Sequence, residues 1–284
     1  MGVATAVDQF QRRHPVLGFP IAVVYKFFDD QGVYLAALIT YYGFLSLFPL
    51  LLLLASVLGF VLRDDPDLQD RILDSTITQF PVIGEQLRDP RGLDGSGVAL
   101  LVGAIVAVYG ALGVGQALQN AVNIAWAVPR NDRPNPVKAR LRSLLLIATG
   151  GIAVLATTTV SVLAGSFGAT DGVMSSEAAI PATVAAVALN SVIFAAVYRI
   201  ATATRLRLRD VLPGAVLSAV VWQLMQVFGT AYAAGVVKDS TPTYGVFALV
   251  LGLFGWTFLV ALGVVLGVEL NVVRSRRLYP RALL

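Results

Sequence analysis

Six stretches of this chain run for about 20 residues or more without a charged side chain. A helix rises about 1.5 Å per residue, so a stretch of this length crosses the hydrocarbon core of a membrane, which is about 30 Å thick. Of the 284 residues, 57% are hydrophobic and 13% are charged, whereas a soluble domain carries about 25% charge. A soluble chain of this length cannot bury so large an apolar share. The sequence therefore predicts an all-α, polytopic membrane protein and excludes a soluble or disordered one.

The predicted spans form a single integral membrane domain over residues 1–284. Their approximate limits are 33–62, 97–120, 143–167, 178–199, 211–236 and 244–272. Within the preceding segment, 1–30, residues 16–28 are apolar but too short to span. We expect an interfacial helix there, with Tyr25, Phe27 and Phe28 at the membrane boundary. Residues 63–96 form the one long loop, which is acidic and predicted to be extracytoplasmic, either as a solvated loop or as a gate or partner surface.

Lysine and arginine are distributed unequally between the two sides of these spans. With a cytoplasmic N-terminus, most of the 21 basic residues fall on the inner side, within 12–26, 130–142, 199–209 and 274–281. The exceptions are Arg63, Arg71, Arg88, Arg91 and Lys238. The positive-inside rule thus predicts that both termini are cytoplasmic. Anionic lipids at the basic loops, rather than nucleic acid, explain the pI near 9.5.

Metal and nucleotide chemistry find few ligands in this sequence. Cysteine is absent and His14 is the single histidine, so a thiolate or multi-histidine metal centre cannot form within the chain. No phosphate-binding G-x-x-x-x-G-K-[ST] loop is present. The inner-side carboxylates Asp132, Asp210 and Glu269 come from separate segments and do not suggest a two-metal centre. We expect no enzyme, no cofactor and no metal.

Polar side chains within the spans are costly in hydrocarbon, so they indicate helix contacts or a functional cavity. Tyr42, Ser46 and Pro49 share one face of the first span, and Pro49 should kink that helix. The candidate cavity residues are Tyr41, Tyr42, Ser46, Pro49, Gln116, Asn120, Asn123, Arg199, Trp222, Gln226, Glu269 and Asn271. Anionic headgroups are expected at Arg205, Arg207, Arg209, Arg274, Arg276 and Arg277.

Glu269 is the only acidic residue this deep in a span. Many of the candidates fall in the cytoplasmic half of the membrane, which favours a polar cavity open to the inner leaflet, with Glu269 paired to Arg199. The competing interpretation is that the amides and hydroxyls hold helices together, at about 0.6 kcal/mol each, and that Glu269 reaches the interface. Gly263 and Gly267 favour close packing of the sixth helix, within one protomer or in a dimer.

Several short patches, taken together, resemble the YihY/BrkB family of bacterial inner-membrane proteins, once labelled ribonuclease BN. They are Ala36–Ala37, Tyr41–Tyr42, Ser46–Leu47–Phe48–Pro49, Leu118, Asn120, Asn123, Trp126, Tyr198–Arg199, Leu212–Pro213–Gly214–Ala215, Trp222, Tyr232, Tyr244–Gly245, Trp256 and Gly267-x-Glu269-Leu270. The sequence departs from the pattern at Val268 and Phe247, where small residues are usual. The resemblance covers about 27–273 and implies six helices with cytoplasmic termini.

Family members are associated with envelope integrity, serum resistance and lipid export, without a settled mechanism. The resemblance and the polar residues together favour a transporter-like or flippase-like protein that moves a lipid or another amphiphile from the inner leaflet. The alternative is a non-transporting membrane scaffold for envelope assembly that acts through the outer loop. A ribonuclease is disfavoured because the metal ligands it needs are missing. Membrane lipids are the expected partners; a second copy or an envelope protein remains open.

Overall fold

The computed structural model describes residues 13, 15–61, 97–168, 176–239 and 242–280. Within these ranges all regular secondary structure is helical, which confirms the predicted all-α class. In chain order the elements are α2 (Pro15–Asp29), α3 (Gly32–Val61), α6 (Gly97–Ala125), the 3-10 helix η2 (Arg130–Asp132), α7 (Pro136–Gly168), α8 (Ser176–Ala201), α9 (Leu208–Asp239) and α10 (Pro242–Ser275). The predicted outer loop, 63–96, lies outside the described residues.

The six long helices coincide with the six apolar stretches and extend beyond them at several ends. The largest extension is at α7, which begins at Pro136 although the apolar stretch begins at 143. Asn135 caps this helix, because its Oδ1 accepts a hydrogen bond from the Lys138 backbone N–H at 2.9 Å. Proline suits the first helical position that follows the cap. The basic residues 138–142 therefore lie on a helix rather than in a loop.

The N-terminal segment forms α2, as predicted, but this helix is packed against the rest of the molecule. Ala22, Val23 and Phe27 are buried, whereas Tyr25 and Phe28 are exposed. The expectation that Phe27 lies at the membrane boundary is therefore wrong. A left-handed residue, Gln31 (φ 58°), separates α2 from α3, and a Cβ on Gly32 would lie 2.3 Å from the Phe27 ring. This tight turn fixes the angle between α2 and α3.

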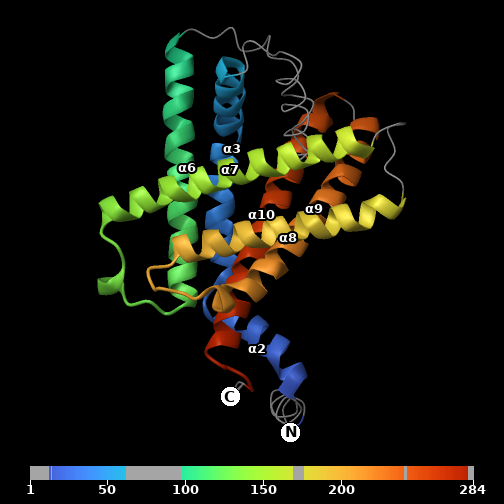
Figure 1. Ribbon diagram of the computed structural model, residues 1–284. Coiled ribbons are helices and arrows are strands. Elements are labelled where there is room, and N and C mark those ends of the chain that lie inside the picture. The colour runs from blue at the N-terminus through green and yellow to red at the C-terminus, as the bar shows by residue number, and fades with distance from the viewer. Residues whose placement is uncertain (1–12, 14, 62–96, 169–175, 240–241, 281–284) are drawn as a thin grey trace.

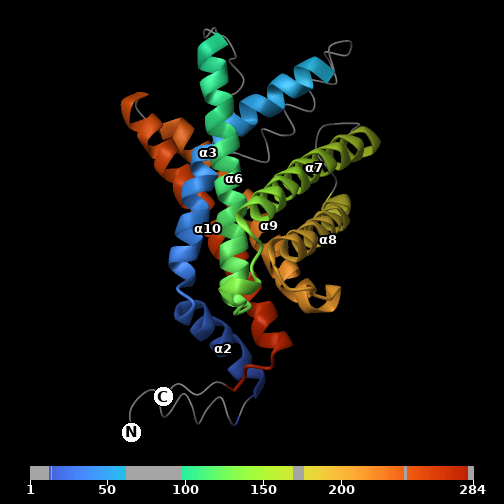
Figure 2. The same ribbon diagram turned by 90° about the vertical axis from the view of Figure 1, so that its left-hand side faces the viewer.

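Figure 1 shows two pairs of neighbouring helices, α3 beside α6 and α9 beside α10, with α7 and α8 crossing them steeply. The start of α2 and the end of α10 lie at the same end of the molecule, at the bottom of the view. Pro49 lies within α3, and Figure 2 shows the C-terminal part of this helix inclined to its N-terminal part, in agreement with the predicted kink. Because α7 and α8 lie at a large angle to the other long helices, the arrangement differs from a bundle of parallel helices.

Residues of α10 take part in each of three clusters of the packed core. One cluster joins Val268 and Val272 of α10 to Val122, Tyr198 and Val211 of α6, α8 and α9. A second joins Ala261 and Val265 of α10 to buried residues of α2, α3 and α6. In a third, Val273 packs against Ala22 and Val23 of α2. The last turns of α10 are thus surrounded by the other helices, and the polar residues described next lie among these clusters.

Candidate functional site

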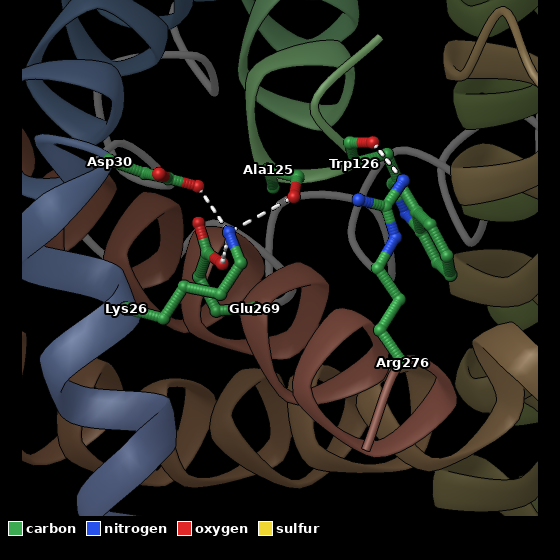
Figure 3. A network of polar contacts seen from close by, with 6 residues as sticks. All are labelled: Lys26, Asp30, Ala125, Trp126, Glu269 and Arg276. Atoms are coloured by element: carbon green, nitrogen blue, oxygen red, sulfur yellow. Dashed lines mark hydrogen bonds and ion pairs between the residues drawn. The ribbon is translucent and has the colours of Figure 1, made fainter. Parts of the chain in front are cut away.

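The most deeply buried charge among the described residues is Glu269 on α10, whose side chain is 0% exposed. Its Oε2 lies 3.0 Å from the Nζ of Lys26 on α2, which is 9% exposed. The same ammonium group contacts Asp30 and donates to the Ala125 carbonyl at the end of α6, at 3.0 Å. Figure 3 shows Lys26 reaching from α2 between these three partners. One lysine thereby joins three elements, and we call Lys26, Asp30 and Glu269 the charge cluster.

The predicted pairing of Glu269 with Arg199 does not occur, because Lys26 occupies that place and Arg199 is exposed on α8. Two carboxylates share one ammonium group in the charge cluster. Glu269 Oε1 has no hydrogen-bond partner in the described part of the chain. From the sequence, Lys26 is predicted only as one of the inner-side charges. The signal available was that Lys26 is the one charged residue within 16–28, one helical turn before Asp30.

A second polar contact joins α6 and α10 next to the charge cluster. Arg276 donates to the Trp126 carbonyl, and its guanidinium carbon lies 5.8 Å from the centre of the Trp126 ring (Figure 3). Cation–π contact of this kind adds about 0.5–2 kcal/mol. Arg274, Arg276 and Arg277 are all exposed, but of these three headgroup candidates Arg276 also contacts another part of the protein.

Helices α8, α9 and α10 are joined by buried hydrogen bonds. Asn271 Oδ1 accepts from the Gly214 backbone N–H at 2.7 Å. The Tyr198 hydroxyl lies 2.6 Å from Ser218 Oγ and donates to the Val264 carbonyl at 2.9 Å. Asn271 thus acts as a contact between helices, as the competing interpretation of the polar residues expects. Tyr198 and Ser218 were not among the candidates.

Three of the candidates come together at one cavity between α6 and the segment that follows it, which we call the amide cavity. Its volume is about 350 Å³, and Gln116, Gln119, Asn120, Asn123, Arg133 and Arg140 line it with Pro134, Pro136 and Ala139. The spacing of Gln116, Asn120 and Asn123 on α6 predicts that they share one face of the helix. Arg133 and Arg140 could not be assigned to this face from periodicity, because Arg133 comes from the turn after α6 and Arg140 comes from the first turns of α7.

Hydrogen bonds order the lining of the amide cavity. Arg133 Nη1 donates to Asn120 Oδ1 at 3.2 Å. Asn123 accepts from the Ala203 backbone N–H at 2.8 Å, which ties α6 to the linker between α8 and α9. Gln119 Nε2 donates to Ser143 Oγ and to the Ala139 carbonyl, and its buried Oε1 has no partner among the described residues. The cavity therefore presents amides and guanidinium groups on a fixed frame.

The remaining candidates lie elsewhere. Tyr41 is exposed, Tyr42 is half-buried against the position of Gly113, and Ser46 is buried and donates to the Gly43 carbonyl at 3.0 Å. Trp222 packs edge-on against Trp256, with ring centres 5.5 Å apart, and Gln226 is half-buried on the same helix. The side chain of Pro49 lies outside the described set. The candidate residues are thus distributed over several helix contacts and cavities and do not line a single cavity.

A second cationic cavity, of about 530 Å³, lies between α7 and the end of α8. Arg142, Arg199, Thr202 and Arg205 line it, with Ala196, Ile200, Ala203, Thr204 and Leu206. We call it the arginine cavity. Arg205 was a headgroup candidate, whereas Arg207 and Arg209 are exposed outside this lining. In the described ranges no group of three or more histidine or acidic side chains could hold a metal ion.

Three of the described helices contain segments long and apolar enough to cross a membrane: Thr183–Ala201, Leu208–Gly229 and Val250–Ser275. Less than half of each segment is buried inside the molecule, so large apolar faces remain for lipid or another apolar surface. These helices, with buried charge only where it is paired, define an α-helical membrane protein. The chain belongs to the virulence factor BrkB family, whose model matches residues 23–283.

Two relatives illustrate the family. One is a Bacillus subtilis (strain 168) protein named as ribonuclease-like, YfkH, which is 27% identical over 255 residues, covering 87% of this chain and 91% of the relative. The other is the Escherichia coli (strain K12) inner membrane protein YhjD, which is 27% identical over 172 residues, covering 58% of this chain and 51% of that protein. No solved structure matches the chain.

Proposed function

We propose that this protein is a transporter-like membrane protein that moves a lipid or another amphiphile from the cytoplasmic leaflet of the bacterial plasma membrane. In this proposal the six long helices all span, and both termini are cytoplasmic. The observation that carries the proposal is the amide cavity. Its location next to the basic residues 130–142 is on the predicted cytoplasmic side.

The chemistry of the amide cavity suits a polar headgroup. Amides both donate and accept hydrogen bonds, and Arg133 and Arg140 add positive charge. Exposed apolar residues continue along α7 from the same region, among them Leu141, Leu144 and Leu145. A polar cavity beside an apolar helix surface is the arrangement that an amphiphile requires, because its headgroup and its chains need different surroundings.

The names of the two relatives bear differently on this proposal. The inner membrane location in the name of YhjD agrees with the proposed location. The ribonuclease-like name of YfkH is not extended to this chain, because a metal-dependent nuclease needs several metal ligands and His14 is the single histidine. We propose no catalytic step.

One set of observations favours a second candidate, a non-transporting scaffold. Lys26, Asn123, Tyr198 and Asn271 are all used in contacts between elements. Such contacts would hold a rigid membrane frame whose working surface is the acidic loop 63–96, which lies outside the described residues. The scaffold predicts that changes in the amide cavity leave function intact and that changes in the loop abolish it.

The experiment that tests transport is lipid translocation in liposomes of phosphatidylethanolamine and phosphatidylglycerol that contain the purified protein. Fluorescent lipid that reaches the outer leaflet is quenched by dithionite, so the quenched fraction measures flipping. The test variant is Asn120→Leu, which removes a cavity amide and the acceptor for Arg133. The matched control is Asn131→Leu, at an exposed asparagine of η2 that does not line the cavity.

We expect the wild type and Asn131→Leu to flip lipid and Asn120→Leu to flip it at least tenfold more slowly. Equal rates in both variants would remove the amide cavity from the pathway. A folded wild-type protein that flips no lipid would contradict lipid transport and favour the scaffold.

A further inference from the structure

The arginine cavity brings together three guanidinium groups that come from different parts of the fold. Arg142 lies in α7, Arg199 lies in the last turn of α8, and Arg205 lies in the linker that leads to α9. No carboxylate of the described chain forms an ion pair with any of the three; the nearest acidic residue in sequence, Asp210, pairs with Arg209. The cavity therefore concentrates positive charge that the described protein does not neutralise.

The wall of this cavity is held in place independently of any ligand. Arg142 Nη1 donates to the Thr202 carbonyl at 3.1 Å, and the Thr202 N–H donates to the Tyr198 carbonyl at 3.2 Å. The next residue, Ala203, donates its N–H to Asn123 on α6. A wall fixed by three hydrogen bonds does not need to be ordered when a ligand binds, which lowers the cost of binding.

Thr202 gives a second and independent sign of a ligand. The residue is 3% exposed and lines the cavity, yet its Oγ1 has no hydrogen-bond partner in the described structure. A buried hydroxyl without a partner costs about 1–3 kcal/mol. An acceptor that reached this hydroxyl from the cavity would satisfy it.

We propose that the arginine cavity binds a phosphate-bearing anion, either the headgroup of an anionic phospholipid or free phosphate. Guanidinium groups bind phosphate oxygens through paired hydrogen bonds, and three of them with a threonine hydroxyl match an anion that has several acceptor oxygens and no need of an acceptor in return. The volume of about 530 Å³ exceeds that of a phosphate and leaves room for an attached glycerol. The proposal is independent of transport, because a scaffold could hold a lipid there equally well.

The test is native mass spectrometry of the full-length protein in detergent, titrated with phosphatidylglycerol and, separately, with phosphatidylcholine. The test variant is the double substitution Arg199→Gln with Arg205→Gln. It leaves Arg142, which supports the Thr202 carbonyl, in place. The matched control is Arg207→Gln with Arg209→Gln, which removes the same charge from exposed positions nearby that do not line the cavity.

We expect phosphatidylglycerol to bind at least tenfold more tightly than phosphatidylcholine, whose choline the arginines repel. The test variant should lose about tenfold in phosphatidylglycerol affinity and the control less than twofold. Equal losses in the two double variants would mean general attraction to basic residues and would overturn the site. So would no loss in either.

A third variant and a competitor sharpen the result. Thr202→Val keeps the shape of the side chain and removes only the hydroxyl, so it should weaken binding severalfold without lowering thermal stability; unchanged binding would overturn the role of Thr202. Millimolar inorganic phosphate, balanced with chloride at constant ionic strength, distinguishes the two sources of the anion. Competition assigns the cavity to free phosphate, and a lack of competition assigns it to the lipid.

Discussion

Lys26 holds two carboxylates of unequal burial. Glu269 is 0% exposed, whereas the Asp30 side chain is 23% exposed and can be partly hydrated. A charge moved out of water loses several kcal/mol of solvation, which an opposite charge regains only while both partners stay in place. Substitutions of the different residues in the charge cluster should therefore lower the free energy of unfolding by different amounts.

Removing Lys26 should be more destabilising than removing its partner. Lys26→Met leaves Asp30 and the buried Glu269 without a cation, and should cost about 3–5 kcal/mol. Glu269→Gln keeps the contacts of Lys26 with Asp30 and with the Ala125 carbonyl, and should cost about 1–2 kcal/mol. Apparent unfolding temperatures in detergent test the order, with Lys138→Met, at an exposed lysine, as the control.

The double variant Lys26→Met with Glu269→Gln should recover part of the loss caused by Lys26→Met alone, because the buried negative charge is then gone. If Glu269→Gln proves as damaging as Lys26→Met, Asp30 does not share the lysine in solution.

At the scale of elements, α9 and α10 approach so closely that glycine is required at their contact. A Cβ on Gly214 would lie 1.8 Å from the Gly267 carbonyl oxygen, and a Cβ on Gly263 would lie 2.5 Å from Val221. The close packing predicted from Gly263 and Gly267 is thus made by α9 of the same chain. It also places Asn271 where it can accept from the Gly214 N–H.

Gly214→Ala should separate α9 from α10 and destabilise the protein by about 1–3 kcal/mol, because the nearest atom is the backbone carbonyl oxygen of Gly267, which cannot turn aside. Gly255→Ala, in α10 itself, is the matched control, since no atom lies within 4 Å of the added methyl group. The control should be neutral or slightly stabilising. Thermal unfolding monitored by size-exclusion chromatography compares the two. Similar midpoints for both variants would contradict the close contact.

The helices could be predicted from the sequence, whereas their partners could not. Long apolar stretches without charge are a local property, so the position of each helix follows from the chain itself, although α7 begins before its apolar stretch. The ion pair between Lys26 and Glu269 joins residues at opposite ends of the sequence, and no periodicity within a span reports such a pair. The amide cavity was partly predictable, because Gln116, Asn120 and Asn123 repeat on one face of α6, but Arg133 reaches it only through the turn that follows.

At the scale of the whole molecule, we predict that all six long helices cross the membrane, including α7 and α8, which lie at a large angle to α3 and α6 (Figure 1). The chain has no cysteine, so a single introduced cysteine is the only thiol. The proposed topology places residues 88 and 171 outside and residues 131 and 207 inside.

In right-side-out membrane vesicles, a membrane-impermeant maleimide should label Arg88→Cys and Asp171→Cys. It should label Asn131→Cys and Arg207→Cys only after the vesicles are permeabilised, which is the control for thiol reactivity. Protection of Asp171→Cys in sealed vesicles would show that α7 and α8 do not cross, and would reduce the number of spans.

The pairing of α2 with α10, the first and last of the described helices, has a consequence for how the protein is made. Lys26 leaves the ribosome early and Glu269 near the end of synthesis, so the ion pair and the packing of Val23 against Val273 form only after α10 exists. Until then the face of α2 that packs against α10 is uncovered, and Lys26 has only Asp30 as its ion-pair partner. Nascent chains interrupted before α10 therefore lack this ion pair and the packing that covers α2.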